Sequence, residues 1–234
     1  MNDDNHDYRL ILNYKRIPYR TEWIEYPEIE PHSKRLGIKP TGIKPDGSPF
    51  YTLPAIHDTT TGVYLADSFP IAEYLDKTYP DTPSIFPHDT ISLQHAFQLS
   101  FANSIAPVRP FIMPAFFPKI GTPESKEYYR RTKEIIFGKT LEQTTPVGAE
   151  KIAQWAKFRE GLSRIDECLA KTDAKGPFVM GDTISWADLF LSGYLIYMKV
   201  VWGEESEEWT AVASWNGRRW ENLLKALEEY QTIN

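Results

Sequence analysis

A proline-rich stretch divides this chain into two parts with different hydrophobic patterns. Residues 80–90 contain three prolines and show no hydrophobic periodicity. Short runs of β-forming residues precede the stretch, and apolar residues spaced three or four apart follow it. Because linkers between domains are commonly rich in proline, the stretch predicts a boundary. We expect a small β-containing domain over residues 1–80, a linker over 81–90 and an all-helical domain over 91–234.

The first part contains short segments bounded by Pro, Gly and Asp. The pattern predicts the end of a helix at 8–14, a turn at 15–18, a strand at 19–26, a loop at 39–49 and a hairpin made of 51–56 and 62–65. Ser68, placed as a cap, and Pro70 in the first turn then predict the start of a helix, which stops before Pro80.

The second part has the periodicity of amphipathic helices. We expect helices over 93–105 and 152–169, another beginning at Thr122, and a final one over 214–230. Ser185 and Asp188 have the spacing of a capping box, in which a hydroxyl and an acidic side chain satisfy the first amides of a helix.

Composition excludes several classes of function. The net charge of −6 and the absence of a strongly basic patch argue against nucleic-acid binding. No apolar run reaches the length of a membrane span. The single cysteine, Cys168, excludes an intrachain disulfide, and its helical setting predicts a buried, inert thiol. The five histidines show no metal-ligand spacing. We therefore expect a cytoplasmic protein without a metal.

Two short motifs favour recognition of a small charged peptide. Pro54 opens a β-like run, and a cis bond there would leave the backbone N–H and C=O of Leu53 free to pair with an extended peptide. Asp67 and Ser68 open a helix, whose first amides and hydroxyl suit a carboxylate while the Asp67 side chain suits an ammonium group. Each motif alone is more often structural, but their order and spacing favour a shared site.

Longer segments carry a family resemblance. Residues 51–56 followed by 66–75 resemble the glutathione-binding half of glutathione transferases, and 181–188 are similar to the folding motif of that family's helical domain. Further segments resemble the fungal-specific class A transferases, which are related to bacterial β-etherases. These segments are 12–19, 25–29, 44–48, 129–132 and the pair Phe137–Gly138.

The resemblance implies a thioredoxin-like N-terminal domain, an all-helical C-terminal domain, glutathione as co-substrate, hydrophobic or aromatic small molecules as ligands, a role in detoxification and a homodimer. It implies that the Leu53 backbone and Pro54 hold the cysteinyl part of glutathione, that Asp67 and Ser68 hold its γ-glutamyl end, and that Lys44 approaches its glycyl carboxylate. A hydrophobic site would be formed by Phe116, Phe117, Tyr194 and Trp202, although aromatic residues at helical spacing are more often core residues.

The chain departs from the family at its beginning. The family's first domain opens with a β-strand followed by the Ser, Tyr or Cys that activates the thiol, whereas the matching segment here begins near Tyr8. We therefore expect the first strand and the activating residue to be missing, and we assign no catalytic residue. Loss of such a donor costs about 3 kcal/mol of transition-state stabilisation. Asn5, His6 and Tyr8 are the available substitutes.

Four hypotheses remain open at this stage. The chain is a glutathione-dependent enzyme that conjugates or thiolyses electrophiles, a non-catalytic carrier of hydrophobic molecules, an incomplete gene product, or a scaffold for dimerisation.

Overall fold

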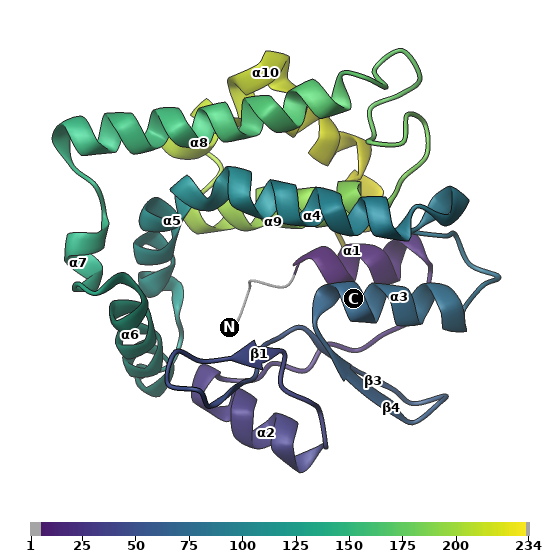
Figure 1. Cartoon of the computed structure of the whole chain (residues 1–234), viewed down its shortest axis with the longest axis horizontal. Coiled ribbons are helices and arrows are strands. Elements are labelled where there is room, and N and C mark those ends of the chain that lie inside the picture. Colours follow the sequence, from purple (N-terminus) through teal and green to yellow (C-terminus); the bar gives the residue numbers. More distant parts are fainter. Residues whose placement is uncertain (1–5, 233–234) are drawn as a thin grey trace.

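The computed structural model describes residues 6–232, and it describes side chains from residue 8 onwards. Figure 1 shows a smaller part with two hairpins below a larger helical part, with α1 lying between them. The elements of the smaller part are α1 (His6–Tyr14), η1 (Tyr26–Glu28), α2 (Ile29–Arg35), β1 (Gly42–Ile43), β2 (Pro49–Phe50), β3 (Ala55–Asp58), β4 (Val63–Ala66) and α3 (Ser68–Thr78).

The predicted hairpin is confirmed as the antiparallel pair β3–β4, in which Ala55 faces Ala66 and Asp58 faces Val63. Its turn is fastened to α3, because the Asp58 carboxylate accepts hydrogen bonds from the hydroxyls of Tyr74 (2.6 Å) and Tyr79 (2.7 Å). Burial opposes ionisation, but these bonds and the turn amides lower the pKa of Asp58 to about 2. Helix α3 ends at Thr78, before Pro80, as predicted.

Two local predictions in this part are wrong, and two local features were not predicted. Residues 19–26 form no strand, because no neighbouring strand among residues 6–232 offers them hydrogen bonds. Helix α2 and the small hairpin β1–β2 were not predicted in a region rich in Pro, Gly and Lys. Asp67, not Ser68, occupies the cap position of α3, and neither side chain makes a capping hydrogen bond.

The larger part is mainly helical. Its elements are η2 (Pro87–Asp89), α4 (Ile91–Ile105), η3 (Ala106–Val108), α5 (Arg109–Phe116), η4 (Phe117–Lys119), α6 (Pro123–Phe137), α7 (Leu141–Thr144), α8 (Gly148–Leu169), α9 (Trp186–Trp202), α10 (Glu207–Ala226) and η5 (Glu228–Tyr230). The predicted helices at 93–105, 122 and 152–169 are confirmed as α4, α6 and α8. In the described chain no helix is long and apolar enough to cross a membrane.

Two predictions in the helical part need correction. The final helix begins at Glu207, seven residues before the predicted start at 214, and a turn of left-handed residues at 216–218 interrupts it. Cys168 is exposed and not buried. The core stripe of α8 is formed by Leu162, Ile165 and Leu169, and the position before Leu169 faces solvent.

Both parts share one hydrophobic core. Leu10 and Ile11 of α1 are at most 1% exposed and belong to the same buried cluster as Ile71 of α3 and Leu195 of α9. Helix α1 lies against both α9 and α3. The proline-rich stretch therefore joins two parts that do not have separate cores.

A buried lysine connects α1, α3 and the proline-rich stretch. The Lys15 side chain is fully buried, and its Nζ donates to Asp76 Oδ1 (2.7 Å) and to the Pro83 carbonyl (3.1 Å). Asp76 also accepts from the Ile85 amide (3.0 Å). Burial raises the pKa of Asp76, but the hydrogen bonds outweigh burial and hold the pKa below its ordinary value. The Ile85 carbonyl then accepts from the Trp186 amide (2.7 Å) at the start of α9.

The predicted capping box at the start of α9 is confirmed. The Asp188 carboxylate accepts from the Ser185 amide (2.9 Å) and hydroxyl (2.7 Å), and it also accepts from the Val179 amide (2.8 Å). Asp188 is 0% exposed. Burial raises its pKa to about 6, against the effect of the hydrogen bonds. The cap therefore includes a carboxyl group that is costly to ionise.

Helices α4 and α8 approach each other closely at one glycine. A Cβ atom added to Gly161 would lie 1.9 Å from the carbonyl oxygen of Ser104. Only glycine allows this contact between a helix and the backbone of its neighbour, and Figure 1 shows the two helices side by side.

We predict that Gly161→Ala lowers the free energy of unfolding by about 3 kcal/mol, because the helices must move apart in a close-packed core. Urea unfolding measures the change. Gly42→Ala is the matched control, since nothing lies within 4 Å of its added Cβ and its φ is not positive. Equal stability of the two variants would contradict the close contact.

We predict that Asp188 makes stability depend on pH. Its pKa rises from 3.8 to about 6 on folding, so the folded state binds the extra proton between these values. The resulting stabilisation is complete below pH 3.8 and is lost as pH rises through about 6. Relative to Asp188→Asn, which cannot titrate, the wild type should lose up to about 3 kcal/mol between pH 4 and 7.

Urea titrations of both proteins across this pH range measure the difference. Asp182→Asn is the control, because Asp182 is exposed and should leave the pH profile unchanged. A constant difference between wild type and Asp188→Asn from pH 4 to 7 would show that Asp188 does not titrate there.

Candidate functional site

A cavity of about 510 Å³ lies between the two parts. The N-terminal part contributes Leu53, Pro54, Asp67 and Ser68 to its wall. The helical part contributes residues of α4, η3, α5, α6 and α9. These are Gln98, Ala102, Ile105, Val108, Arg109, Ile112, Met113, Tyr129, Lys133, Phe190, Gly193, Tyr194, Tyr197 and Met198. The helical side is therefore mostly apolar, and the N-terminal side carries the Asp67 carboxylate and the Ser68 hydroxyl.

The backbone at Leu53 is open to a ligand. The Leu53–Pro54 peptide bond is cis. The Pro54 carbonyl accepts from the Asp67 amide (3.0 Å), whereas neither the N–H nor the C=O of Leu53 makes a hydrogen bond within residues 6–232. Backbone groups of this kind pair with an extended peptide in the way that a strand edge does.

Asp67 connects this backbone to the start of α3. It has a φ of +81°, a conformation that costs a residue other than glycine about 1–3 kcal/mol. Its carbonyl accepts from the Ile71 amide (3.0 Å), and no described residue bonds its carboxylate. Ser68, 9% exposed, follows as the first residue of the helix. A carboxylate for an ammonium group thus lies beside a hydroxyl and helix-start amides for a carboxylate.

The helical wall is held together by Tyr129. Its hydroxyl donates to the Met113 carbonyl (3.0 Å), which fixes α6 against α5. Tyr194 of α9, 36% exposed, makes edge contacts with Phe190 and Phe101 at ring-centroid distances of 5.1 and 5.4 Å. Aromatic and aliphatic side chains therefore present a firm apolar surface to the cavity.

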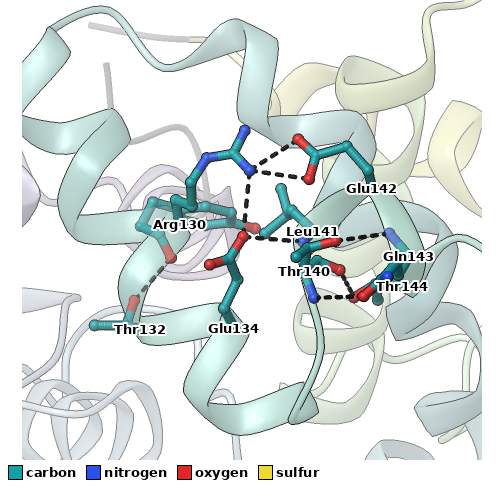
Figure 2. A network of polar contacts seen from close by, with 9 residues as sticks. Arg130, Thr132, Glu134, Thr140, Leu141, Glu142, Gln143 and Thr144 are labelled. Carbon is teal, nitrogen blue, oxygen red and sulfur yellow. Dashed lines mark hydrogen bonds and ion pairs between the residues drawn. The ribbon is translucent and has the colours of Figure 1, made fainter.

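Helix α6 is anchored at its start and at its middle. At its start the Glu25 carboxylate accepts hydrogen bonds from the hydroxyls of Ser125 and Thr122 (2.8 Å), and these bonds, that of Ser125 most, hold the pKa of Glu25 below its usual range. At its middle, Arg130 binds Glu134 (3.2 Å) and Glu142 of α7 (2.8 Å), as Figure 2 shows. The two anchors therefore hold the part of α6 that places Tyr129 and Lys133 in the cavity wall.

Four residues predicted for the site lie elsewhere. Lys44 makes an ion pair with Glu30 (2.9 Å) on α2 and does not line the cavity. Phe116 is only 1% exposed and belongs to the core, as expected for aromatic residues at helical spacing. Phe117 lies under the Arg130 guanidinium (4.6 Å), and Trp202 packs against Trp155 with ring centroids 5.8 Å apart.

The predicted substitute donors are not at the described wall. Asn5 lies outside the described residues, as does the side chain of His6. Tyr8 is described, and it packs against the core without lining the cavity. Of these three residues, only Tyr8 has a described side chain, so the described part of the chain places none of them at the cavity.

Sequence reasoning missed the polar groups Gln98, Arg109 and Lys133. The Gln98 Oε1 is buried and has no hydrogen-bond partner in the described chain. The one available sequence signal was Arg109, a cation set between two prolines in an otherwise apolar run. In the described part of the chain, no group of three His, Cys, Asp or Glu side chains could hold a metal ion.

Comparisons with known families match both parts of the chain. Residues 6–78 match the glutathione S-transferase N-terminal domain, and residues 92–230 match the glutathione S-transferase C-terminal domain. The predicted fold class is confirmed: a thioredoxin-like N-terminal domain with small sheets is followed by a helical domain.

Solved structures and curated proteins agree with these matches. A glutathione S-transferase of Ceriporiopsis subvermispora, crystallised with glutathione, is 40% identical, with 99% of this chain and 92% of that chain covered and a TM-score of 0.93. The transferase GSTFuA3 of Phanerochaete chrysosporium is 38% identical, with coverage of 99% and 91% and a TM-score of 0.91. The glutathione S-transferase-like protein ustS of Aspergillus flavus is 28% identical, with coverage of 97% and 88%. The chain belongs to the glutathione S-transferase family.

Proposed function

We propose that this protein binds glutathione at the polar wall of the cavity and transfers it to an apolar, electrophilic small molecule held by the helical wall. The observation that carries the proposal is the meeting of both walls in one cavity. The unbonded Leu53 backbone, the Asp67 carboxylate and Ser68 face the apolar side chains of α4, α5 and α9 there. The complex of the Ceriporiopsis relative with glutathione supports the same ligand here.

The roles follow from the chemistry of each group. The Leu53 N–H and C=O pair with the cysteinyl residue of glutathione. Asp67 receives the γ-glutamyl ammonium group, and Ser68 with the first amides of α3 receives its carboxylate. In transfer, the glutathione thiolate attacks an electrophilic carbon, an S–C bond forms, and the leaving group departs with its electron pair. Lys44, paired with Glu30, keeps at most a secondary role.

A non-catalytic function is the second candidate. The observation that favours it is that Tyr8, the described substitute donor, does not line the cavity. Under this alternative the protein carries glutathione and hydrophobic molecules without joining them. The proposal in either form includes a homodimer, membership of the fungal class A group and a location in the reducing cytoplasm, where glutathione is the main thiol.

We predict that Ser68→Ala weakens glutathione binding about tenfold or more, because one hydrogen bond to a charged carboxylate is lost. Isothermal titration calorimetry measures the dissociation constant. Ser92→Ala, an exposed serine on α4, is the matched control and should bind as the wild type does. An unchanged affinity for Ser68→Ala would remove Ser68 from the site.

We predict that the wild type converts an activated chloroaromatic compound and glutathione to the conjugate with release of chloride, and that Ser68→Ala lowers kcat/KM about as much as it weakens binding. Absorbance of the conjugate gives the rate. Retention of the protein on glutathione-agarose without any conjugate would reject the enzyme and leave the carrier function.

A further inference from the structure

The helical wall contains two cations that the transfer reaction described above does not use. Arg109 begins α5, and Lys133 lies in the second half of α6. The only carboxylate among the described residues of the wall is Asp67, which belongs to the N-terminal part. The cavity wall therefore has one carboxylate, on the N-terminal part, and two cations, on α5 and α6.

Arg109 and Lys133 lie on the faces of α5 and α6 that are turned toward each other. Arg109 lies one turn before Met113, and Lys133 lies one turn after Tyr129, whose hydroxyl bonds the Met113 carbonyl (3.0 Å). Residues four apart share a helix face, so both cations belong to the faces that this hydrogen bond brings together. The Lys133 Nζ lies 5.2 Å from the centre of the Tyr129 ring, on the same side of α6.

Arg109 differs from the other arginines near α6 in its contacts. Arg130 pairs with Glu134 and Glu142, and Arg131 lies over the Tyr128 ring. Within the described residues the Arg109 side chain makes no hydrogen bond, ion pair or ring contact, although Arg109 lines the cavity. An arginine placed in this way presents a planar set of donors that match a carboxylate or sulfonate.

We propose that the second substrate is an aromatic or aliphatic molecule that carries an anionic group, and that Arg109, with Lys133 beside it, binds that group. The apolar body lies on apolar residues of the same wall, Ile105, Ile112 and Phe190. The inference rests on the proposed function, because glutathione takes the part of the wall formed by Leu53, Asp67 and Ser68. The Asp67 carboxylate adds to the selectivity, because it repels an anion from that part of the wall.

The test uses two fluorescent probes with the same ring system. One is 8-anilino-1-naphthalenesulfonate, and the other is N-phenyl-1-naphthylamine, which lacks the sulfonate. We expect the wild type to bind the sulfonate probe more tightly, and Arg109→Gln to weaken that probe about tenfold while the neutral probe changes less than twofold. The preference should fall as salt is raised. Arg20→Gln, at an exposed arginine away from the cavity, should match the wild type.

Three results would overturn the inference. These are an unchanged affinity of Arg109→Gln for the sulfonate probe, an equal loss for both probes, or a loss of glutathione affinity as large as the loss for the sulfonate. In the last case the cation serves glutathione, and the proposed function stands without this inference. Because the probes are measured without glutathione, a wild type that binds no glutathione would reject the proposed function alone.

Discussion

The ion pair between Lys15 and Asp76 is the interaction on which the arrangement of the two parts depends. Removing one partner of a buried pair leaves an uncompensated charge, at a cost of about 3–5 kcal/mol. Here the pair also fixes geometry, because Lys15 directly follows α1, Asp76 belongs to α3, and both hold the proline-rich stretch at Pro83 and Ile85. The Ile85 carbonyl also accepts a hydrogen bond from the Trp186 amide at the start of α9. The proline-rich stretch, which divides the sequence, therefore joins the two parts in space.

The cavity depends on this connection, because each part supplies only one of its walls. Helix α3 begins at the polar wall with Ser68 and carries Asp76 eight residues later. Helix α9 begins at Trp186 and reaches the apolar wall at Phe190. A shift of α3 relative to α9 would therefore change the distance between a bound thiol and its electrophile. A second connection, from Glu25 to the start of α6, holds the opposite side.

The features that could be predicted from sequence are those decided by neighbouring residues. The β3–β4 hairpin, the end of α3 before Pro80 and the Ser185–Asp188 box each have their signals within a few positions. The features that could not be predicted depend on distant partners. Residues 19–26 have β-forming composition but no strand beside them among the described residues, and Lys15 is buried only because Asp76 lies 61 positions later. The cations of the cavity could not be predicted for the same reason, because no residue near Arg109 in the sequence indicates what its side chain faces.

In the proposed reaction, the charged groups of the cavity wall orient the two substrates differently. Glutathione has an ammonium group at its γ-glutamyl end, which suits the Asp67 carboxylate and the helix start beside it. In the proposed arrangement, a molecule with an anionic group is repelled there and attracted toward Arg109 and Lys133 of the same cavity wall. Such an arrangement orients the electrophile without a residue that touches the reacting carbon. Positioning of this kind contributes to catalysis through the entropy of orientation, and it acts independently of whichever group activates the thiol.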